Sequence, residues 1–239
     1  KHFTYNFDFY YKNDAREMKT VGKPLGKYSF QQDAWTTGAD DPSTLYTRMY
    51  YTRTSNYKMT NVLNYNQTFG SHDVAAMVGF EQEHMNYRIT DANKLGLTDA
   101  SVNDFNASTK PYNSSGYGDD WASRSFFGRV NYSYKGKYIL EANFRYDGSS
   151  RFAPEYRWGF FPSGSAAWRI SQEDFMKGSP VSDLKLRASY GILGNNSIGN
   201  YDWQSVYSAA NYASGGGQIS GIAITSIANS GLMWEETAV

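Results

Sequence analysis

Four neighbouring residues in the first half of the chain could ligate a metal ion: Glu81, Gln82, Glu83 and His84. Carboxylates and imidazoles are the usual ligands of zinc and related ions. The residues around them alternate between apolar and polar types, which is the period of a β-strand. On a strand, Glu81 and Glu83 share one face and His84 points to the other, so the three cannot close on one ion. The spacing therefore favours carboxylates on a polar face over a metal centre.

Motifs of catalytic sites are missing from the sequence, which contains no G-x-S-x-G elbow, no P-loop and no complete G-x-G-x-x-G motif. Gly116 and Gly118 come nearest to the last of these, but no third glycine follows them. Cysteine is absent, so disulfides and thiolate metal sites are excluded. We therefore predict that the chain is not an enzyme and holds no cofactor.

Adjacent acidic residues occur in three predicted connections, as the pairs Asp40 and Asp41, Asp119 and Asp120, and Glu173 and Asp174. A solvated loop explains such pairs, and weak calcium binding is the alternative.

Aromatic residues in the predicted connections are better candidates for contacts with a ligand or a partner. Tyr and Trp rings stack on sugars and anchor protein interfaces. The alternative is that they pack the loops against each other or lie at a membrane interface. The candidates come from two long connections: Tyr112, Tyr117 and Trp121 in the first, and Tyr201, Trp203, Tyr207 and Tyr212 in the second.

A strict period of two governs residues 138–147 and predicts the strand that positions the charged candidates. The even positions are Tyr138, Leu140, Ala142, Phe144 and Tyr146, and the odd positions are Ile139, Glu141, Asn143, Arg145 and Asp147. Residues 126–134 alternate in the same way, and Lys135, Gly136 and Lys137 join the two segments with a glycine available for positive φ. The sequence therefore predicts a hairpin with one apolar and one polar face.

Charged residues at the polar positions of three predicted strands are Arg129, Glu141, Arg145, Lys185 and Arg187. If the polar face lines a water-filled interior, these side chains could tune the passage of a cargo. The alternative is that they balance one another across neighbouring strands.

The apolar face is rich in Tyr and Phe, whereas a soluble sandwich buries mostly aliphatic side chains. Rings with polar tips suit a membrane boundary, and an outward apolar band with aromatic girdles is typical of outer-membrane barrels. The face is therefore predicted to contact outer-membrane lipid. A soluble β-sandwich with tyrosine-rich strands is the alternative.

Composition agrees with a β-protein of this kind. The 239 residues include 21 Tyr, 14 Phe and 22 Gly but only 6 Pro, a mixture that favours strands and turns. The 23 basic and 23 acidic residues give a formal charge of zero, so nothing indicates a nucleic-acid partner. Nowhere do about 18 apolar residues run together, which excludes a transmembrane helix, whereas a barrel strand needs only about 9 to 11 residues.

The same patterns divide the chain into about nine antiparallel strands. They cover residues 3–10, 27–32, 45–53, 58–69, 74–83, 126–134, 138–147, 158–170 and 184–193. The predicted connections are residues 12–26, 33–43, a turn around Ser55 and Asn56, and residues 91–120, 148–157, 171–183 and 194–231. The lengths of the later connections suit a barrel with long external loops and short periplasmic turns.

Such strands alone would leave two raw sheet edges, which a bilayer does not tolerate. The rest of a longer chain, or other subunits, must therefore complete the wall. The first residues contain no signal peptide and the last ones resemble the start of a strand, so we expect an excerpt of a longer protein.

Several spaced segments resemble the barrel of the SusC/RagA family of TonB-linked outer-membrane transporters. They are FGRVNY at 127–132, YILEANFRYDGSSRF at 138–152, GFFPS at 159–163 followed by Ala167, Trp168 and Arg169, LKLRASYGILGNNSIGNY at 184–201, and Leu232, Trp234 and Glu235. The similarity is densest over residues 121–201 and looser over residues 57–83.

The resemblance implies an all-β fold, a transmembrane antiparallel up-and-down β-barrel of about 22 strands, of which residues 1–239 form a partial wall. It implies a plug domain and a TonB-contacting segment upstream, outside this chain. It further implies a SusD-like lipoprotein partner, energy from TonB and its inner-membrane complex, and a cargo of oligosaccharides or oligopeptides.

We therefore expect a segment of a TonB-dependent importer in the bacterial outer membrane. A family member that acts as a scaffold in a larger outer-membrane assembly is the first alternative, and a soluble carbohydrate-binding sandwich is the second.

Overall fold

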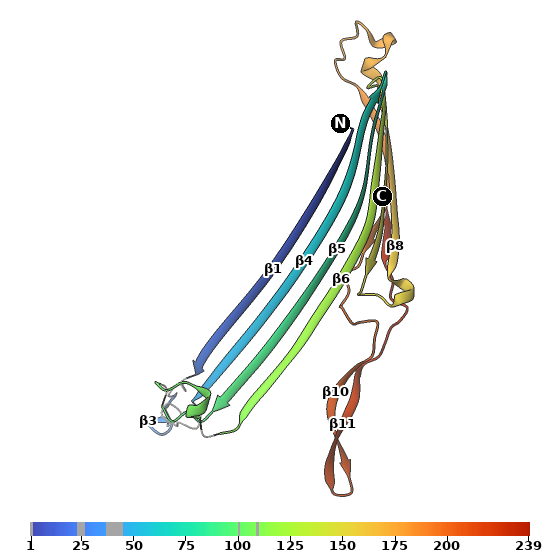
Figure 1. The fold of residues 1–239 in the computed structure, drawn as a ribbon. Helices are drawn as coiled ribbons and strands as arrows, with labels where there is room; N and C mark the ends of the chain where they lie inside the picture. The colour runs from blue at the N-terminus through green and yellow to red at the C-terminus, as the bar shows by residue number, and fades with distance from the viewer. Residues whose placement is uncertain (1, 23–26, 37–44, 100, 109) are drawn as a thin grey trace. The chain divides into compact units, whose positions relative to one another are not determined.

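The computed structural model describes residues 2–22, 27–36, 45–99, 101–108 and 110–239. Its main element is an eight-stranded sheet in the order β1-β4-β5-β6-β7-β8-β9-β12 (Figure 1). The strands are β1 (Phe3–Gly22), β4 (Tyr46–Phe69), β5 (His72–Leu95), β6 (Tyr112–Tyr134), β7 (Tyr138–Ser149), β8 (Trp158–Arg169), β9 (Lys185–Asn195) and β12 (Glu235–Ala238). The sheet confirms the predicted all-β fold with an up-and-down order.

Smaller elements lie in the connections. Two hairpins stand outside the main sheet, β2 (Lys27–Ser29) with β3 (Ala34–Thr36), and β10 (Val206–Ser214) with β11 (Gly217–Ser226). The 3-10 helices are η2 (Phe105–Ala107), η3 (Pro154–Tyr156), η4 (Ile170–Gln172) and η5 (Asp174–Met176). Across the described residues, no helix is long and apolar enough to cross a bilayer.

The chain divides into two compact units. The first contains Lys1–Tyr10, Tyr57–His84 and Trp121–Val239, and the second contains Tyr11–Asn56 and Met85–Asp120.

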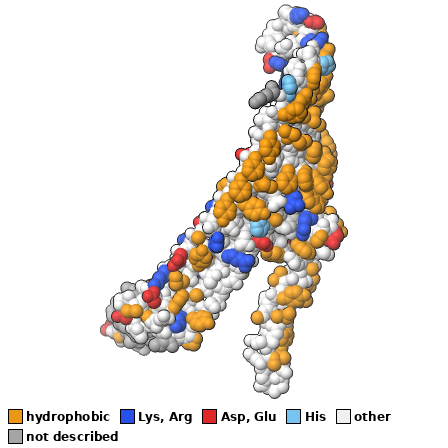
Figure 2. Space-filling view, viewed as in Figure 1, with side chains coloured by type: hydrophobic (Ala, Val, Ile, Leu, Met, Phe, Trp, Pro, Cys, Tyr) orange, Lys and Arg blue, Asp and Glu red, His pale blue; other side chains and the backbone are white. Residues whose placement is uncertain are grey.

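Strand register in the first unit separates two faces. Leu140 lies between Tyr132 and Ala166, and Glu141 lies between Asn131 and Ser165. We call the even-numbered residues of 126–134, 138–146, 158–168 and 186–190 the apolar face, and the odd-numbered ones the polar face. Leu140 and Leu186 are 52% and 62% exposed, so the apolar residues do not form a dry protein core. Figure 2 shows hydrophobic side chains gathered over the visible face of the sheet.

Two groups of stacked rings lie on the apolar face, toward opposite ends of β7. At one end Tyr138 stacks on Trp168, with centroids 6.4 Å apart. At the other end Trp158 stacks on Tyr146 at 4.8 Å and on Phe126 at 6.2 Å. Tyr138 and Tyr146 are separated by roughly 26 Å along the strand, at about 3.3 Å per residue. A strand tilt of about 40° reduces this to about 20 Å, close to the apolar band of outer-membrane barrels.

The predicted turn between β6 and β7 is confirmed. Lys135 and Gly136 have φ values of 52° and 66°, and the Lys137 amide donates to the Tyr134 carbonyl at 2.9 Å. Positive φ at both central residues matches the right-handed twist of the flanking strands. The Lys135 amide also donates to the Ser71 carbonyl at 2.8 Å, so this turn lies beside the β4–β5 turn.

A small core closes the other end of these strands. Phe152 is fully buried and packs on Trp234, with centroids 5.2 Å apart. Trp234 packs on Phe161 at 5.1 Å and donates from Nε1 to the Arg157 carbonyl at 3.0 Å. The connection between β7 and β8 is therefore fixed to the residues that precede β12.

In the second unit, Arg48 of β4 donates from Nε to Asp91 of β5 at 2.8 Å. Leu97 is fully buried and forms an isolated bridge with Ser108. The first contact ties β4 to β5, and the second closes the connection between β5 and β6 on itself.

Several predicted boundaries were wrong. Ser55 and Asn56 lie within one continuous strand, β4, and not in a turn. Residues 12–22 belong to β1, and residues 91–120 include the end of β5 and the start of β6. Paired backbone groups keep a strand extended where no apolar period marks it. The predicted strand at 27–32 is part of the β2–β3 hairpin, and the region 194–231 contains the β10–β11 hairpin.

The acidic pairs also differ from the prediction. Asp119 and Asp120 lie on β6 and not in a connection. Glu173 and Asp174 do lie in the connection between β8 and β9. Asp40 and Asp41, and most of the connection predicted at 33–43, lie outside the described residues.

Candidate functional site

The polar face of the first unit carries a chain of hydrogen bonds across β6 and β7. Arg129 faces Asn143 in the register and donates from Nε to its Oδ1 at 2.7 Å. Asn143 in turn donates from Nδ2 to Glu141 Oε1 at 2.9 Å. The Asn143 amide therefore links the Arg129 guanidinium to the Glu141 carboxylate.

Arg145 forms a second polar group further along β7. Its Nε and Nη2 donate to the two oxygens of Asp147 at 3.1 and 3.0 Å, and Nη2 also donates to the Ser125 hydroxyl at 3.2 Å. The guanidinium lies 5.5 Å from the centroid of the Phe127 ring. The Arg145 side chain is 49% exposed whereas Asp147 is 17% exposed, so the arginine still presents donors to solvent.

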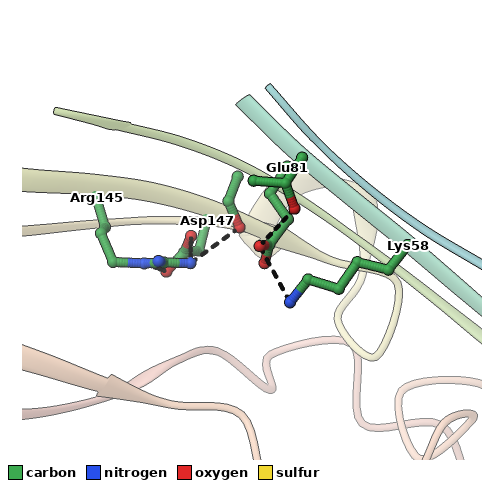
Figure 3. A network of polar contacts seen from close by, with 6 residues as sticks. Lys58, Glu81, Arg145 and Asp147 are labelled. Carbon is green, nitrogen blue, oxygen red and sulfur yellow. Dashed lines mark hydrogen bonds and ion pairs between the residues drawn. The ribbon is translucent and has the colours of Figure 1, made fainter. Parts of the chain in front are cut away.

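Lys58 and Glu81 form a third polar group, which involves β4 and β5. Their Nζ and Oε2 atoms are 3.0 Å apart, and the Thr60 hydroxyl donates to the same carboxylate oxygen at 3.3 Å. Figure 3 shows this pair and the Arg145–Asp147 pair in one view. No group of three or more potential metal ligands occurs in the described ranges.

A depression of about 410 Å³ lies between the charged groups of β6 and β7 and the end of β9, where β9 pairs with β12. Arg129, Asn143, Arg145 and Asp147 line it with Phe127 and Phe161, and Ser163, Ile192 and Leu193 complete much of its rim. Its lining offers guanidinium and amide donors, carboxylate and amide acceptors, and three phenylalanine rings. Such a surface can hydrogen-bond peptide or sugar groups.

Lys185 and Arg187 lie on the polar face of β9. Lys185 faces Arg169 and Arg187 faces Ala167 across the β8–β9 ladder. Two cations therefore stand directly opposite each other at this end of the sheet, an arrangement that is unfavourable without screening.

The aromatic candidates predicted in the first long connection lie on a strand. Tyr112, Tyr117 and Trp121 all belong to β6. In the second unit Tyr117 packs on Tyr87, with centroids 6.1 Å apart. In the first unit the Trp121 ring lies under the Arg151 guanidinium at 5.4 Å. Their predicted loop location was therefore wrong.

The aromatic candidates of the second long connection divide between a hairpin and a linker. Tyr207 and Tyr212 lie on β10, and the Tyr212 hydroxyl donates to the Ile222 carbonyl at 2.6 Å. Tyr201 and Trp203 precede the hairpin. The turn of the hairpin contains Gly215 and Gly216, whose φ values are 54° and 89°.

Sequence reasoning missed Asn143, Asp147 and Phe161 as members of the depression. Asn143 and Asp147 share the odd parity of Glu141 and Arg145, so the period-two signal could have found them. No such signal marks Phe161 in the sequence, because an aromatic ring at a polar-face position does not follow the period. Only the residues packed around it account for its place. Gly159 and Gly194 lie so close that added Cβ atoms would be 2.4 and 2.1 Å from the Phe161 ring.

Comparison with known proteins assigns the family. The family model described as "TonB dependent receptor-like, beta-barrel" matches residues 1–236. TonB-dependent receptor P3 of Formosa agariphila is 31% identical over 246 residues, covering 97% of this chain and 24% of that protein. TonB-dependent receptor SusC of Bacteroides thetaiotaomicron is 36% identical over 139 residues, covering 58% of this chain and 14% of SusC.

Solved structures have the same fold. The RagAB peptide transporter superposes with a TM-score of 0.79 at 24% identity, and the RagAB peptide importer in its "open-open" state with a TM-score of 0.84 at 24% identity. Each match covers all of this chain and 25% of the other chain. The chain thus spans about a quarter or less of the proteins it matches. A soluble sandwich is excluded, and the chain belongs to the SusC/RagA family of TonB-dependent receptors, as part of a β-barrel in the bacterial outer membrane.

Proposed function

We propose that this chain is a wall segment of a TonB-dependent importer that carries oligopeptides or oligosaccharides across the outer membrane. The observation that carries the proposal is the division of one sheet into an exposed apolar face and a hydrogen-bonding polar face. A membrane-spanning wall needs lipid on the first face, and a conducting interior needs water and cargo on the second.

The polar face suits cargo that carries amide or hydroxyl groups. Arg129, Asn143 and Arg145 present donors beside the ring of Phe127, and Asp147 presents an acceptor. Peptide groups and sugar hydroxyls both use this mixture. The peptide transport named for the RagAB structures supports the first cargo class. The charges predicted to face the lumen would then tune which cargo passes.

The rest of the proposed protein lies beyond this chain. We infer an upstream plug domain and TonB-contacting segment, and a SusD-like lipoprotein that covers the extracellular mouth. Tyr201, Trp203, Tyr207 and Tyr212 are candidates for contact with that lipoprotein or with cargo. Energy would come from TonB and its inner-membrane complex, so this wall segment itself needs no nucleotide or redox site.

The test is uptake of fluorescent oligopeptides and oligosaccharides by cells that express the full-length protein. Import should require the protein and should stop when TonB is deleted. The scaffold alternative predicts a different result: loss of this protein would disrupt the outer-membrane assembly, while uptake would stay unchanged when either this protein or TonB is deleted. Uptake that persists without TonB would contradict the proposal.

A further inference from the structure

A pocket of about 260 Å³ opens on the same side of the sheet as the apolar face, at the end of β7 that lies beyond Tyr146. The register explains its position, because Arg124 pairs with Gly148 and Gly148 pairs with Trp158. The three residues form one row across β6, β7 and β8. Gly148 has no side chain, so the Trp158 indole lies directly over it, where an added Cβ would be 2.9 Å from three ring atoms, and Arg124 stands on the other side of this glycine.

The next row toward the middle of the sheet is entirely aromatic. It consists of Phe126, Tyr146 and Phe160, and Phe126 and Tyr146 both stack on Trp158. Such rings mark the boundary between the hydrocarbon and the headgroups in outer-membrane barrels. The pocket therefore lies one row beyond that boundary, at the level of lipid headgroups.

The pocket belongs to the extracellular boundary. The short turns, at residues 70–71 and 135–137, lie at the opposite ends of these strands, and the long connection at residues 196–234 follows β9 at the pocket end. Outer-membrane barrels place short turns in the periplasm and long loops outside the cell.

The charge of the pocket is positive. Arg124 and Arg157 line it together with Gln82, Ser150 and Trp158, and Ala122, Ser123 and Gly148 complete the lining without an acidic residue. The Nε atom of Arg157 is buried and has no hydrogen-bond partner among the described residues. A buried guanidinium N–H without an acceptor is unfavourable, and an anion in the pocket would stabilise the positive charge of the same guanidinium.

A hydrogen-bond chain holds Arg124 in place. Its Nη2 donates to Gln82 Oε1 at 3.1 Å, and Gln82 Nε2 donates to the Tyr57 hydroxyl at 3.1 Å. Tyr57 packs on His84, with ring centroids 5.6 Å apart. One edge of the Arg124 guanidinium is thus fixed by protein, which leaves its other donors for a ligand.

We propose that this pocket binds the phosphate group of a glycolipid in the outer leaflet. Two guanidinium groups match the geometry of phosphate oxygens and keep their charge at any physiological pH. The adjacent rings and the apolar face give the acyl chains of the same molecule a surface to follow. The site is separate from the polar face, so it anchors the wall in its membrane and does not select cargo.

The experiment uses the full-length transporter, delipidated in detergent and titrated with lipids under native mass spectrometry. The probes are monophosphoryl lipid A, the same lipid after removal of its phosphate, and inorganic phosphate. Monophosphoryl lipid A should bind the wild type at least about tenfold more tightly than either other probe. Equal affinity for the dephosphorylated lipid, or for inorganic phosphate, would overturn the proposal.

Three double variants locate the binding. Arg124→Gln with Arg157→Gln should weaken monophosphoryl lipid A by about tenfold or more, whereas Arg129→Gln with Arg187→Gln removes the same charge from the polar face and should leave that affinity unchanged. Arg124→Lys with Arg157→Lys keeps the charge and should bind with intermediate affinity. Heat-modifiable migration on a gel verifies that each barrel is folded. Equal loss in the matched control would show that net charge, and not this pocket, attracts the lipid.

These results are independent of the proposed transport. A transporter that imports cargo but does not distinguish the two lipids would contradict the proposal of lipid binding at this pocket and would leave the proposed transport intact.

Discussion

The Tyr138 hydroxyl donates a 2.7 Å hydrogen bond to Oε1 of Glu173, a residue 35 positions further along the chain. Trp168 donates from Nε1 to the same oxygen at 2.9 Å, and Lys137 donates from Nζ to Oε2 at 3.0 Å. One carboxylate therefore joins the start of β7, the end of β8 and the connection that follows. Together the three donors, of which Tyr138 has the largest effect, lower the pKa of Glu173 to about 2.

Glu173→Gln should make the barrel less resistant to heat at neutral pH, because the charged acceptor of three hydrogen bonds is lost. The folded-state pKa of Glu173 lies below its ordinary value of 4.5, so the unfolded chain takes up the proton more readily. The stabilisation is then fully present above about pH 4.5 and is lost as the pH falls toward 2. Heat-modifiable gel migration at pH 7 and pH 3 should show the gap between wild type and variant narrowing at the lower pH.

Asp174→Asn is the matched control for Glu173. Lys177 lowers the pKa of the Asp174 carboxyl, but the two side chains are 77% and 85% exposed, so solvent screens the pair. The thermal transition of the Asp174→Asn variant should therefore stay near that of the wild type. An equal loss in both variants would show that general surface charge stabilises this connection.

Phe152→Ala should remove much of the small core that fixes the β7–β8 connection. Phe152 is fully buried against Trp234, and replacing a buried ring with a methyl group costs about 3–5 kcal/mol. Urea unfolding of the vesicle-inserted barrel measures this change in the free energy of unfolding. Phe175→Ala, at a ring that is 70% exposed, should cost no more than about 0.5 kcal/mol. Indistinguishable midpoints for the two variants would contradict the packing described.

Much of the first unit could be predicted from the sequence, because a strand between lipid and water must alternate. Residues 138–147 therefore predicted β7, both of its faces and the turn before it. The strand segments that the sequence did not predict are those where the alternation stops. Around Ser55 and at Tyr112 both faces are polar or mixed, so no apolar period remains, and ladder hydrogen bonds alone keep the chain extended.

The site was predictable only in part for a related reason. The odd positions of β7 identify Glu141 and Arg145, but the sequence does not say that Asn143 bridges Arg129 to Glu141. The row of Arg124, Gly148 and Trp158 depends on the register of three strands, which no single strand encodes.

Gly194→Ala should disturb the depression on the polar face. The added Cβ would lie 2.1 Å from the Phe161 ring, and that ring is confined by Gly159 and Trp234 as well. Forcing a carbon into a packed site costs typically about 1–3 kcal/mol, measurable as a lower urea midpoint.

A control variant and a double variant test whether the contact between Gly194 and Phe161 is responsible. Gly164→Ala adds a Cβ whose nearest neighbour is 3.5 Å away, so its midpoint should hardly change. Combining Gly194→Ala with Phe161→Leu should recover stability relative to the sum of the single variants. Strict additivity in that cycle would mean that the two residues do not compete for space.

Cysteine substitution at two adjacent residues tests which solvent each face meets. This chain has no native cysteine, so Leu140→Cys and Glu141→Cys can be compared in a transporter whose other cysteines have been replaced. Leu140 belongs to the apolar face, so the cysteine placed there should stay unlabelled by a charged, water-soluble maleimide, because lipid shields it and keeps its thiol protonated. Glu141 belongs to the polar face, so the cysteine placed there should react with the charged maleimide in the vesicle-inserted barrel, because that face meets water. The two residues share the same strand, depth and flanking sequence, so only their direction differs. Equal labelling of both by the charged reagent would mean that the apolar face is not in the bilayer, and the assignment of the two faces would then be wrong.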